Sequence, residues 1–436
     1  MIARRFHCPI QKWALKTPNH PAIISKNKIF SYQDFDQAVT AMAERLRKLN
    51  VRLRERVAIV ASNSVEEIIL LFALWRIQAV PCLFSPRLVK TTLKKYIRQL
   101  KCRCLNLNNL NKPRRFVWTK QTYEVCLRFN QPADIIFTSG TTGEPKAAVH
   151  TLGNHYFSAK GANAHIPFSS NDRWLLSLPL YHVGGLGILF RVFLAGGSLV
   201  IPSTEQSLEQ SLKRYQITHV SCVSTQLYRL LNFRSFVWKE YLKAVLVGGG
   251  PVPKILIEKA VQKKMPIYTT YGLTEMSSQV ATSQRLSDKD CGPRATILKY
   301  RQVKIAPDGE ILVKGKTLFQ GYLKANKIQK IRGWFKTGDL GRFDKKGLVV
   351  LGRKDDMFIS GGENIQPAEI EVYLKQHKDI KEAVVISKAH REFGSRPIAF
   401  VKTWKNKPLK PQQLKSHLAK HLPKFKIPDQ FYKLKT

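Results

Sequence analysis

The chain has few acidic residues for its number of basic ones. Its 436 residues include 30 Asp and Glu against 73 Lys and Arg, which gives a formal net charge of +43 at pH 7. Such a charge attracts polyanions, but the basic residues run through the whole chain, and no recognition helix or RNP-like motif accompanies them. We therefore expect no specific nucleic-acid partner. The charge fits a solvated surface or a field that suits anionic reactants.

Long apolar runs are also absent from the sequence. The longest, residues 68–75, is far shorter than the roughly 20 residues of a membrane-spanning helix, and it predicts a buried helix. Residues 1–18 carry basic side chains but no apolar core of the length found in signal peptides. Together these absences predict a cytoplasmic protein without a membrane span.

Cysteines are few and show no paired spacing. The seven lie at positions 8, 82, 102, 104, 126, 222 and 291. An odd number without pairs fits a reducing compartment rather than a disulfide framework. Cys102 and Cys104 are too close together for the usual zinc knuckle, and no second Cys or His pair follows them. We expect no metal site there.

Short apolar runs alternate with amphipathic segments in the first two thirds of the chain. The pattern predicts strands at 57–60, 79–84 and 244–247 and a helix at 64–75. Such alternation is typical of an α/β fold with parallel strands, whose ligand-binding loops gather at strand ends.

The pattern changes near residue 309 to short strands with Asp-Gly and Lys-Gly turns, which predict a β-rich subdomain. A polar, flexible stretch at 352–355 precedes a compact α+β pattern from residue 369 onward. We therefore expect two domains. Residues 1–351 form a large domain of stacked α/β subdomains plus the β-rich subdomain, and residues 352–436 form a small α+β domain.

Nine residues, 138–146, combine hydroxyls, glycines and one lysine directly after the apolar residues 135–137. Glycine lets backbone N–H groups turn towards an anion, Ser and Thr add neutral donors, and Lys146 supplies charge. The run predicts a cradle for the phosphates of ATP, with a plain polar loop as the alternative. It does not match G-x-x-x-x-G-K-[ST], because Gly140 and Gly143 are too close together and no Ser or Thr follows Lys146.

Three further segments follow in order. They are Tyr-Gly-Leu-Thr-Glu at 271–275, Thr-Gly-Asp-Leu at 337–340, and Gly-Arg-Lys-Asp-Asp at 352–356, the last followed by Ile-Ser-Gly-Gly-Glu-Asn-Ile at 359–365. With the 138–146 run, their order and separation resemble the adenylate-forming superfamily of acyl-CoA synthetases, firefly-type luciferases and peptide-synthetase adenylation domains. The resemblance covers nearly the whole chain.

The resemblance implies roles for the matching residues. In the family the 138–146 loop holds the β- and γ-phosphates, Tyr271 flanks the adenine, and Asp339 and Arg353 fix the ribose hydroxyls. By residue type alone, Asp339 also fits a turn aspartate. The nucleotide-binding residues expected in this way are Thr138, Ser139, Gly140, Thr141, Thr142, Gly143, Gly248, Gly249, Gly250, Tyr271, Gly272, Asp339 and Arg353.

The resemblance also implies the catalytic residues, which are Lys146, His182, Thr274 and Glu275. Thr274 and Glu275 match residues that bind phosphate and Mg²⁺, and Glu275 is the expected metal ligand. By residue type alone, Glu275 also fits a capping or surface acid. Asp355 matches the hinge about which the small, mobile C-terminal domain swings between two half-reactions.

The implied chemistry has two steps. A carboxylate attacks the α-phosphorus of Mg·ATP to give an acyl-adenylate and pyrophosphate, and the thiol of coenzyme A then displaces AMP. Catalysis comes from alignment of the reactants and, in the first step, from neutralisation of charge on the phosphorus, so no enzymic nucleophile is needed. The chain accordingly shows no Ser-His-Asp or Cys-His constellation.

His182 and Arg191 occur in the apolar stretch 178–191. A core histidine is the commoner interpretation of His182, but the resemblance places it at the acyl pocket. Arg191 is costly to bury unless it meets an anion, and snorkelling to the surface is the alternative.

This stretch, with 224–227 and 278–282, is most similar to the o-succinylbenzoate–CoA ligase branch of menaquinone biosynthesis, whose acid carries two carboxylates. We expect His182, Arg191, Ser224 and Thr282 to bind the acid, with Arg191 meeting the second carboxylate.

The family also has a lysine in a Gly-Lys context that reaches the reacting groups, beyond a segment like 425–428. No Gly-Lys follows that segment before Thr436. We expect a shortened C-terminal domain in which Lys433 or Lys435 replaces that lysine, or in which it is missing. The alternatives are a ligase for another carboxylic acid and a non-catalytic nucleotide- or polyanion-binding descendant. The sequence leaves the oligomeric state open.

Overall fold

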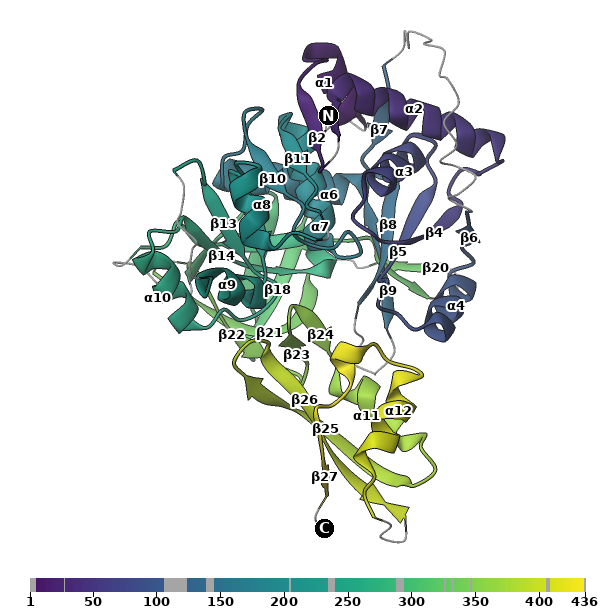
Figure 1. Ribbon diagram of the computed structural model, residues 1–436, viewed down its shortest axis with the longest axis vertical. Coiled ribbons are helices and arrows are strands. Elements are labelled where there is room, and N and C mark those ends of the chain that lie inside the picture. The colour runs from purple at the N-terminus through teal and green to yellow at the C-terminus, as the bar shows by residue number, and fades with distance from the viewer. Residues whose placement is uncertain are drawn as a thin grey trace.

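The computed structural model describes residues 5–26, 28–105, 124–138, 145–203, 205–233, 240–287, 294–324, 327–330, 333–345, 347–404 and 408–434. Two large sheets and their helices form the upper part of the molecule, and a small α+β unit lies at the lower end, where the chain terminates (Figure 1). This is the α/β fold with a small second domain that the sequence predicts.

The first large sheet has the strand order β20-β19-β9-β8-β5-β4-β6. Its members are β4 (Arg56–Val60), β5 (Val80–Phe84), β6 (Arg103–Cys104), β8 (Pro132–Thr138), β9 (Lys146–Thr151), β19 (Gly321–Lys324) and β20 (Lys327–Lys330). β4, β5, β6 and β8 run parallel, and β9 returns antiparallel to β8. Thr138 and Lys146 are ladder partners at the end of that hairpin, so both ends of the expected phosphate loop meet.

The second large sheet joins a parallel half to an antiparallel half. The parallel half contains β2 (Pro21–Ile24), β10 (Arg173–Leu175), β11 (Ser198–Val200), β12 (His219–Cys222), β13 (Ala244–Val247) and β14 (Ile267–Leu273), with β3 (Ile29–Ser31) at its edge. The antiparallel half contains β15 (Ser278–Thr282), β16 (Arg294–Ile297), β17 (Arg301–Ile305), β18 (Glu310–Gly315), β21 (Phe335–Asp344) and β22 (Gly347–Arg353). The short turn η1 (Thr274–Met276) lies at the junction of the two halves.

One apolar core unites the two sheets. It contains Ile136 of β8, Leu199 of β11 and residues from helices packed between them. The helices of this region are α1 (Pro9–Lys16), α2 (Tyr32–Lys48), α3 (Val65–Arg76), α4 (Lys90–Gln99), α6 (Leu152–His165), α7 (Val183–Ala195), α8 (Leu208–Arg214), α9 (Ser224–Leu231) and α10 (Lys254–Gln262). In the same region, β1 (Arg5–His7) and β7 (Cys126–Arg128) pair as a small antiparallel sheet.

The predicted elements agree with the structure to within one residue at either end. α3 begins after Ser64, whose hydroxyl accepts a hydrogen bond from the Glu67 amide, a cap that typically stabilises a helix by about 1 kcal/mol. Apart from Arg191, α7 consists of apolar residues and is buried along nearly its whole length, and Gly196 ends it with a φ of 81°. Across the described residues, no helix is long and apolar enough to span a membrane.

The C-terminal unit has a core of its own. Its elements are β23 (Phe358–Ser360), β24 (Glu363–Ile365), α11 (Pro367–Lys375), β25 (Ile380–His390), β26 (Gly394–Thr403), α12 (Pro411–Ala419), η3 (Lys424–Lys426) and β27 (Gln430–Lys433). Ile370, Val385 and Leu418 belong to its apolar cluster, which is separate from those of the large sheets. The boundary expected after residue 351 lies within β22, which ends at Arg353, and β23 begins at Phe358. We therefore propose that the boundary follows Arg353, two residues later than the sequence pattern indicates.

Candidate active site

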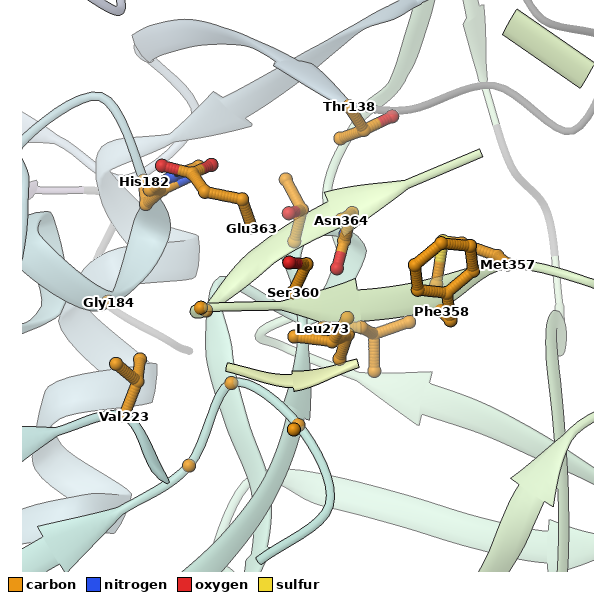
Figure 2. A pocket seen from close by; sticks show the side chains of 18 of the residues that line it. Thr138, His182, Gly184, Val223, Leu273, Met357, Phe358, Ser360, Glu363 and Asn364 are labelled. Atoms are coloured by element: carbon orange, nitrogen blue, oxygen red, sulfur yellow. The ribbon is translucent and has the colours of Figure 1, made fainter. Parts of the chain in front are cut away.

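A cavity of about 2390 Å³ lies between the two domains. It is larger than the roughly 300–1,000 Å³ that holds one drug-sized ligand, so it has room for more than one reactant. Figure 2 shows Thr138, His182 and Leu273 of the large domain facing Ser360, Glu363 and Asn364 of the small one. The cavity also contains most of the residues expected from the sequence, among them Lys146, Arg191, Ser224, Gly248, Gly249, Gly250, Tyr271, Gly272, Thr274, Glu275, Asp339, Arg353 and Asp355.

The part of the cavity expected to hold the phosphates is formed by β8, β9 and η1. Lys146 Nζ lies 5.5 Å from the centre of the Tyr322 ring, and the Tyr322 hydroxyl donates to Glu275 Oε1 at 2.5 Å. The structure thus places a cation and a carboxylate on the same tyrosine, next to the loop that starts at Thr138. Ser139, Gly140, Thr141, Thr142 and Gly143 lie outside the described residues, so their expected role stays a prediction.

The backbone after η1 is strained. Ser277 and Ser278 have φ angles of 54° and 105°, which cost about 1–3 kcal/mol each for residues with a side chain. Gly272 shows how tight the junction is, because a Cβ there would lie 2.2 Å from the carbonyl oxygen of Ser278. Thr274 and Glu275 are therefore presented by a turn that surrounding contacts must hold.

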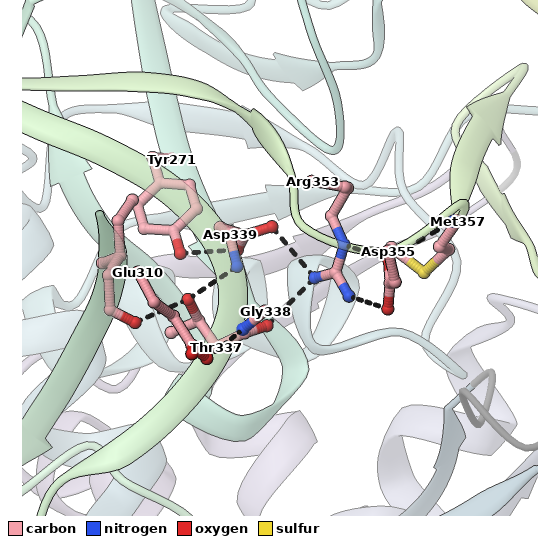
Figure 3. Close-up of polar contacts among 9 residues, drawn as sticks. Tyr271, Glu310, Thr337, Gly338, Asp339, Arg353, Asp355 and Met357 are labelled. Atoms are coloured by element: carbon pink, nitrogen blue, oxygen red, sulfur yellow. Dashed lines mark hydrogen bonds and ion pairs between the residues drawn. The ribbon is translucent and has the colours of Figure 1, made fainter. Parts of the chain in front are cut away.

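The residues expected to hold the ribose form a hydrogen-bonded group around Asp339 (Figure 3). The Tyr271 hydroxyl donates to Asp339 Oδ2 at 2.6 Å, and Arg353 Nη1 donates to Asp339 Oδ1 at 2.9 Å. Burial raises the pKa of the Asp339 carboxyl, and the contacts with Tyr271 and Arg353 only partly offset this effect. The turn-aspartate interpretation is wrong, since Asp339 lies within β21, is buried and faces the cavity.

A β-bulge places Asp339 opposite Arg353. The turn pairs Asp344 with Gly347, and this register would set Asp339 against Gly352. The register shifts by one residue between Leu340 and Gly341, so Arg353 becomes the partner instead. Directly opposite residues share one face of the sheet, which puts both side chains into the cavity.

Asp355, the expected hinge, is tied to the same arginine. Arg353 donates from Nε to Asp355 Oδ1 at 2.9 Å and from Nη2 to Asp355 Oδ2 at 2.7 Å. Burial lowers the pKa of Arg353, but the carboxylates of Asp355 and Asp339 outweigh it and the net shift is upward. One guanidinium thus connects the last strand of the large domain to the start of the small one.

The part of the cavity expected to hold the acid is lined by a buried arginine. Arg191 is only 2% exposed, so it does not snorkel to the surface. Its Nη2 donates to the side chain of Gln279, its guanidinium lies 5.2 Å from the centre of the Trp174 ring, and its Nε has no hydrogen-bond partner within the described chain. Burial lowers the pKa of Arg191 to about 10, so the group stays charged at neutral pH.

Nothing in the described residues neutralises this charge. No carboxylate pairs with Arg191 there, and Arg301, the buried cation beside it, donates only to oxygens of Gln279, Lys299 and Ser158. Burial, reinforced by the charge of Arg191, lowers the pKa of Arg301 to about 9. Two buried cations without a carboxylate make this end of the cavity attractive to an anion.

Thr282 and Ser224, also expected to bind the acid, differ in their exposure to the cavity. Thr282 is fully buried and its hydroxyl accepts from the Gln279 amide at 2.8 Å, so it orients Gln279 from behind rather than lining the cavity. Ser224 lines the cavity at the start of α9, where its hydroxyl donates to Pro251 O at 3.0 Å.

His182 contacts the small domain. Its Nε2 lies 3.1 Å from Glu363 Oε2, and Arg87 Nη1 lies 3.3 Å from Glu363 Oε1. Burial raises the pKa of Glu363, but His182 and Arg87 outweigh it and lower the pKa overall. The sequence places Glu363 in the 359–365 motif but indicates no role for it, because no pattern marks its contact with His182. No motif contains Tyr322, so its contact with Glu275 was missed.

The chain matches two protein families. Residues 10–323 match the AMP-binding enzyme family, and residues 369–436 match the AMP-binding enzyme C-terminal domain. The chain belongs to the AMP-binding enzyme family. A 2-succinylbenzoate–CoA ligase from Bacillus cytotoxicus is 34% identical over an alignment of 447 positions, gaps included. The alignment covers 96% of this chain and 92% of the relative. Membership in the AMP-binding enzyme family and such full-length relatives make the protein an adenylate-forming acid–CoA ligase.

Two solved structures of o-succinylbenzoate CoA synthetase from Bacillus subtilis superpose on this AMP-binding enzyme with different TM-scores. A double mutant bound with its product analogue OSB-NCoA gives a TM-score of 0.89 at 29% identity and covers 99% of this chain and 95% of that one. The enzyme in complex with ATP and magnesium ion gives 0.74 at 30% identity, with coverage of 99% and 96%. Since identity and coverage are nearly equal, the difference in TM-score comes from structure and not from sequence.

Proposed function

We propose that the protein converts o-succinylbenzoate to its CoA thioester, with ATP cleaved to AMP and pyrophosphate. The observation that carries the choice of acid is Arg191, a buried cation that faces the cavity and pairs with no carboxylate in the described residues. An acid with one carboxylate at the reacting centre and a second at the far end would supply the missing anion. The similarity to 2-succinylbenzoate–CoA ligases supports the same acid.

The geometry supports a division of the cavity between the reactants. Tyr271, Asp339 and Arg353 would hold the nucleoside, because a carboxylate can accept from two ribose hydroxyls while Arg353 keeps it in place. Lys146, Thr274 and Glu275 would hold the phosphates and Mg²⁺, with Glu275 as the carboxylate ligand. Bound Mg²⁺ neutralises phosphate charge.

The test of the proposal is a pyrophosphate-release assay over a panel of carboxylic acids, with and without CoA. We expect turnover with o-succinylbenzoate and little with benzoate or medium-chain fatty acids, which lack a second carboxylate for Arg191. Comparable turnover with the monocarboxylates would contradict the acid assignment and leave the ligase class in place. The absence of pyrophosphate release with every acid would favour the non-catalytic alternative.

We further propose that the present domain arrangement serves thioester formation. The higher TM-score to the structure that holds a CoA product analogue supports this assignment. So do the contacts that join the domains here, in which Glu363 meets His182 and Arg87, and Thr92 donates to His421 O at 3.0 Å. Asp355 is the proposed hinge from which the other arrangement is reached.

Glu363→Gln is expected to slow conversion of preformed acyl-adenylate to thioester about tenfold, since one charge-assisted hydrogen bond contributes roughly 1.5 kcal/mol. Adenylation, measured as pyrophosphate release before CoA is added, is expected to stay within about twofold. Glu392→Gln is the matched control, because Glu392 forms an exposed ion pair with Arg229 across the same domain interface. Equal effects of the two substitutions on thioester formation would argue against a specific role for Glu363.

The proposal also includes a cytoplasmic location. The six described cysteines are free thiols, and Cys8, Cys82 and Cys222 are buried. Cys82 neighbours Cys102 without forming a disulfide. Free thiols of this kind suit a reducing compartment.

A further inference from the structure

Three fully buried ionisable side chains lie behind the part of the cavity expected to hold the phosphates: Asp134 of β8, His150 of β9 and His155 of α6. His150 Nδ1 is 2.7 Å from Asp134 Oδ1, and His155 Nε2 is 2.5 Å from Asp134 Oδ2. These separations are those of hydrogen bonds. Ligands around a tetrahedral metal with bonds of about 2.0 Å lie roughly 3.3 Å apart, so the cluster is a hydrogen-bonded network rather than a metal centre.

His150 connects this network to η1. Its second ring nitrogen, Nε2, donates to the carbonyl oxygen of Thr274 at 2.8 Å. Both ring nitrogens of His150 therefore face acceptors, so both carry a proton and the ring forms an ion pair with Asp134. His155 differs, because its Nδ1 has no partner among the described residues and its ring stacks on Phe190.

The contact to Thr274 falls where the backbone needs support. Ser277 and Ser278 follow with positive φ angles that residues with side chains rarely adopt. Ser158 Oγ donates to Ser277 O at 2.7 Å and Ser277 Oγ donates to Thr317 O at 3.0 Å, which hold the far side of the turn. On the near side, the His150 ring holds Thr274, which lines the cavity.

We propose that His150, fixed by Asp134, is a positioning residue for the Mg·ATP site. Its ring holds the carbonyl of Thr274 and thereby the orientation in which Thr274 and Glu275 meet the phosphates and Mg²⁺. His150 itself is fully buried and does not line the cavity. The inference rests on the proposed function, which assigns Thr274 and Glu275 to those groups.

The test compares His150→Phe with His155→Phe. Each substitution removes one hydrogen bond to Asp134 from a fully buried ring, but only His150 contacts Thr274. Mg·ATP affinity is measured by calorimetry without acid or CoA, and deuterium uptake at 274–278 is measured without any ligand. We expect His150→Phe to weaken Mg·ATP binding about tenfold and to speed exchange at 274–278. We expect His155→Phe to lower the thermal midpoint without either change.

Unchanged Mg·ATP affinity in His150→Phe would overturn the proposal, and so would an equal loss of Mg·ATP affinity in the two variants. A stoichiometric metal ion bound to the Asp134, His150 and His155 cluster of the purified protein would also overturn it. If the phenylalanine variants do not fold, His150→Gln and His155→Gln replace them, with the same contrast expected at a smaller size. If the wild-type protein binds no Mg·ATP, the proposed function fails, and ligand-free exchange at 274–278 still decides whether His150 holds the turn.

Discussion

Arg191→Met is expected to raise the KM for the acid about ten- to a hundredfold and to leave the KM for ATP within about twofold. A hydrogen bond to a charged group contributes roughly 1.5–3 kcal/mol, and the variant loses such a contact with the second carboxylate. Methionine fills much of the volume of the arginine stem, so the buried helix α7 keeps its packing. The measurement is steady-state kinetics with each reactant varied in turn.

Two controls separate recognition from folding. Arg191→Lys keeps the charge but loses the planar fork, so we expect it to recover part of the acid affinity. Arg76→Met removes another buried guanidinium, one that pairs with Asp36 and does not line the cavity, so it should lower stability without changing the KM for the acid. An unchanged KM for the acid in folded Arg191→Met would show that the buried charge is structural.

The position of Arg191 could be predicted from sequence because the evidence for it is local. An arginine within an apolar run either reaches the surface or is buried and needs an anion, and the burial of α7 along nearly its whole length excludes the surface. The loop between β8 and β9 was also marked by its local composition, but the antiparallel return of β9 beside β8 was not predicted. Local patterns also set the strands and helices that agree with the structure.

Contacts between distant segments could not be predicted in this way. Tyr322 reaches Glu275 from β19, which joins the first large sheet only by pairing with β9. His150 occurs in a short, almost fully buried strand and no motif marks it. Its ring contacts Thr274 only because the two large sheets meet there. The pairing of Asp339 with Arg353 depends on a bulge at Leu340 and Gly341, and turn chemistry alone predicts the wrong partner. Such contacts follow from register and packing, which single-sequence patterns do not encode.

The bulge leads to the prediction with the largest expected effect on the nucleotide. Asp339→Asn is expected to lower kcat/KM for ATP by about 10²–10³, because the amide replaces a carboxylate that would accept from two ribose hydroxyls at roughly 1.5 kcal/mol or more each. Arg353 keeps its two hydrogen bonds to Asp355, so the guanidinium is not left unpaired and the variant should fold. The KM for the acid, set at the other end of the cavity, should change little.

Asp308→Asn is the control for this substitution. Asp308 forms an exposed ion pair with Lys354 at 2.7 Å and does not line the cavity. Its neighbour Gly309 accepts a hydrogen bond from Gly341 N at the bulge. Asp308→Asn should leave kcat/KM for ATP within about twofold, because exposed pairs contribute little. If Asp339→Asn loses activity only through KM for the acid, the nucleoside does not sit against Asp339 and the division of the cavity is wrong. If Asp339→Asn and Asp308→Asn lower kcat/KM for ATP equally, the effect arises from the backbone around the bulge and not from a contact to ribose.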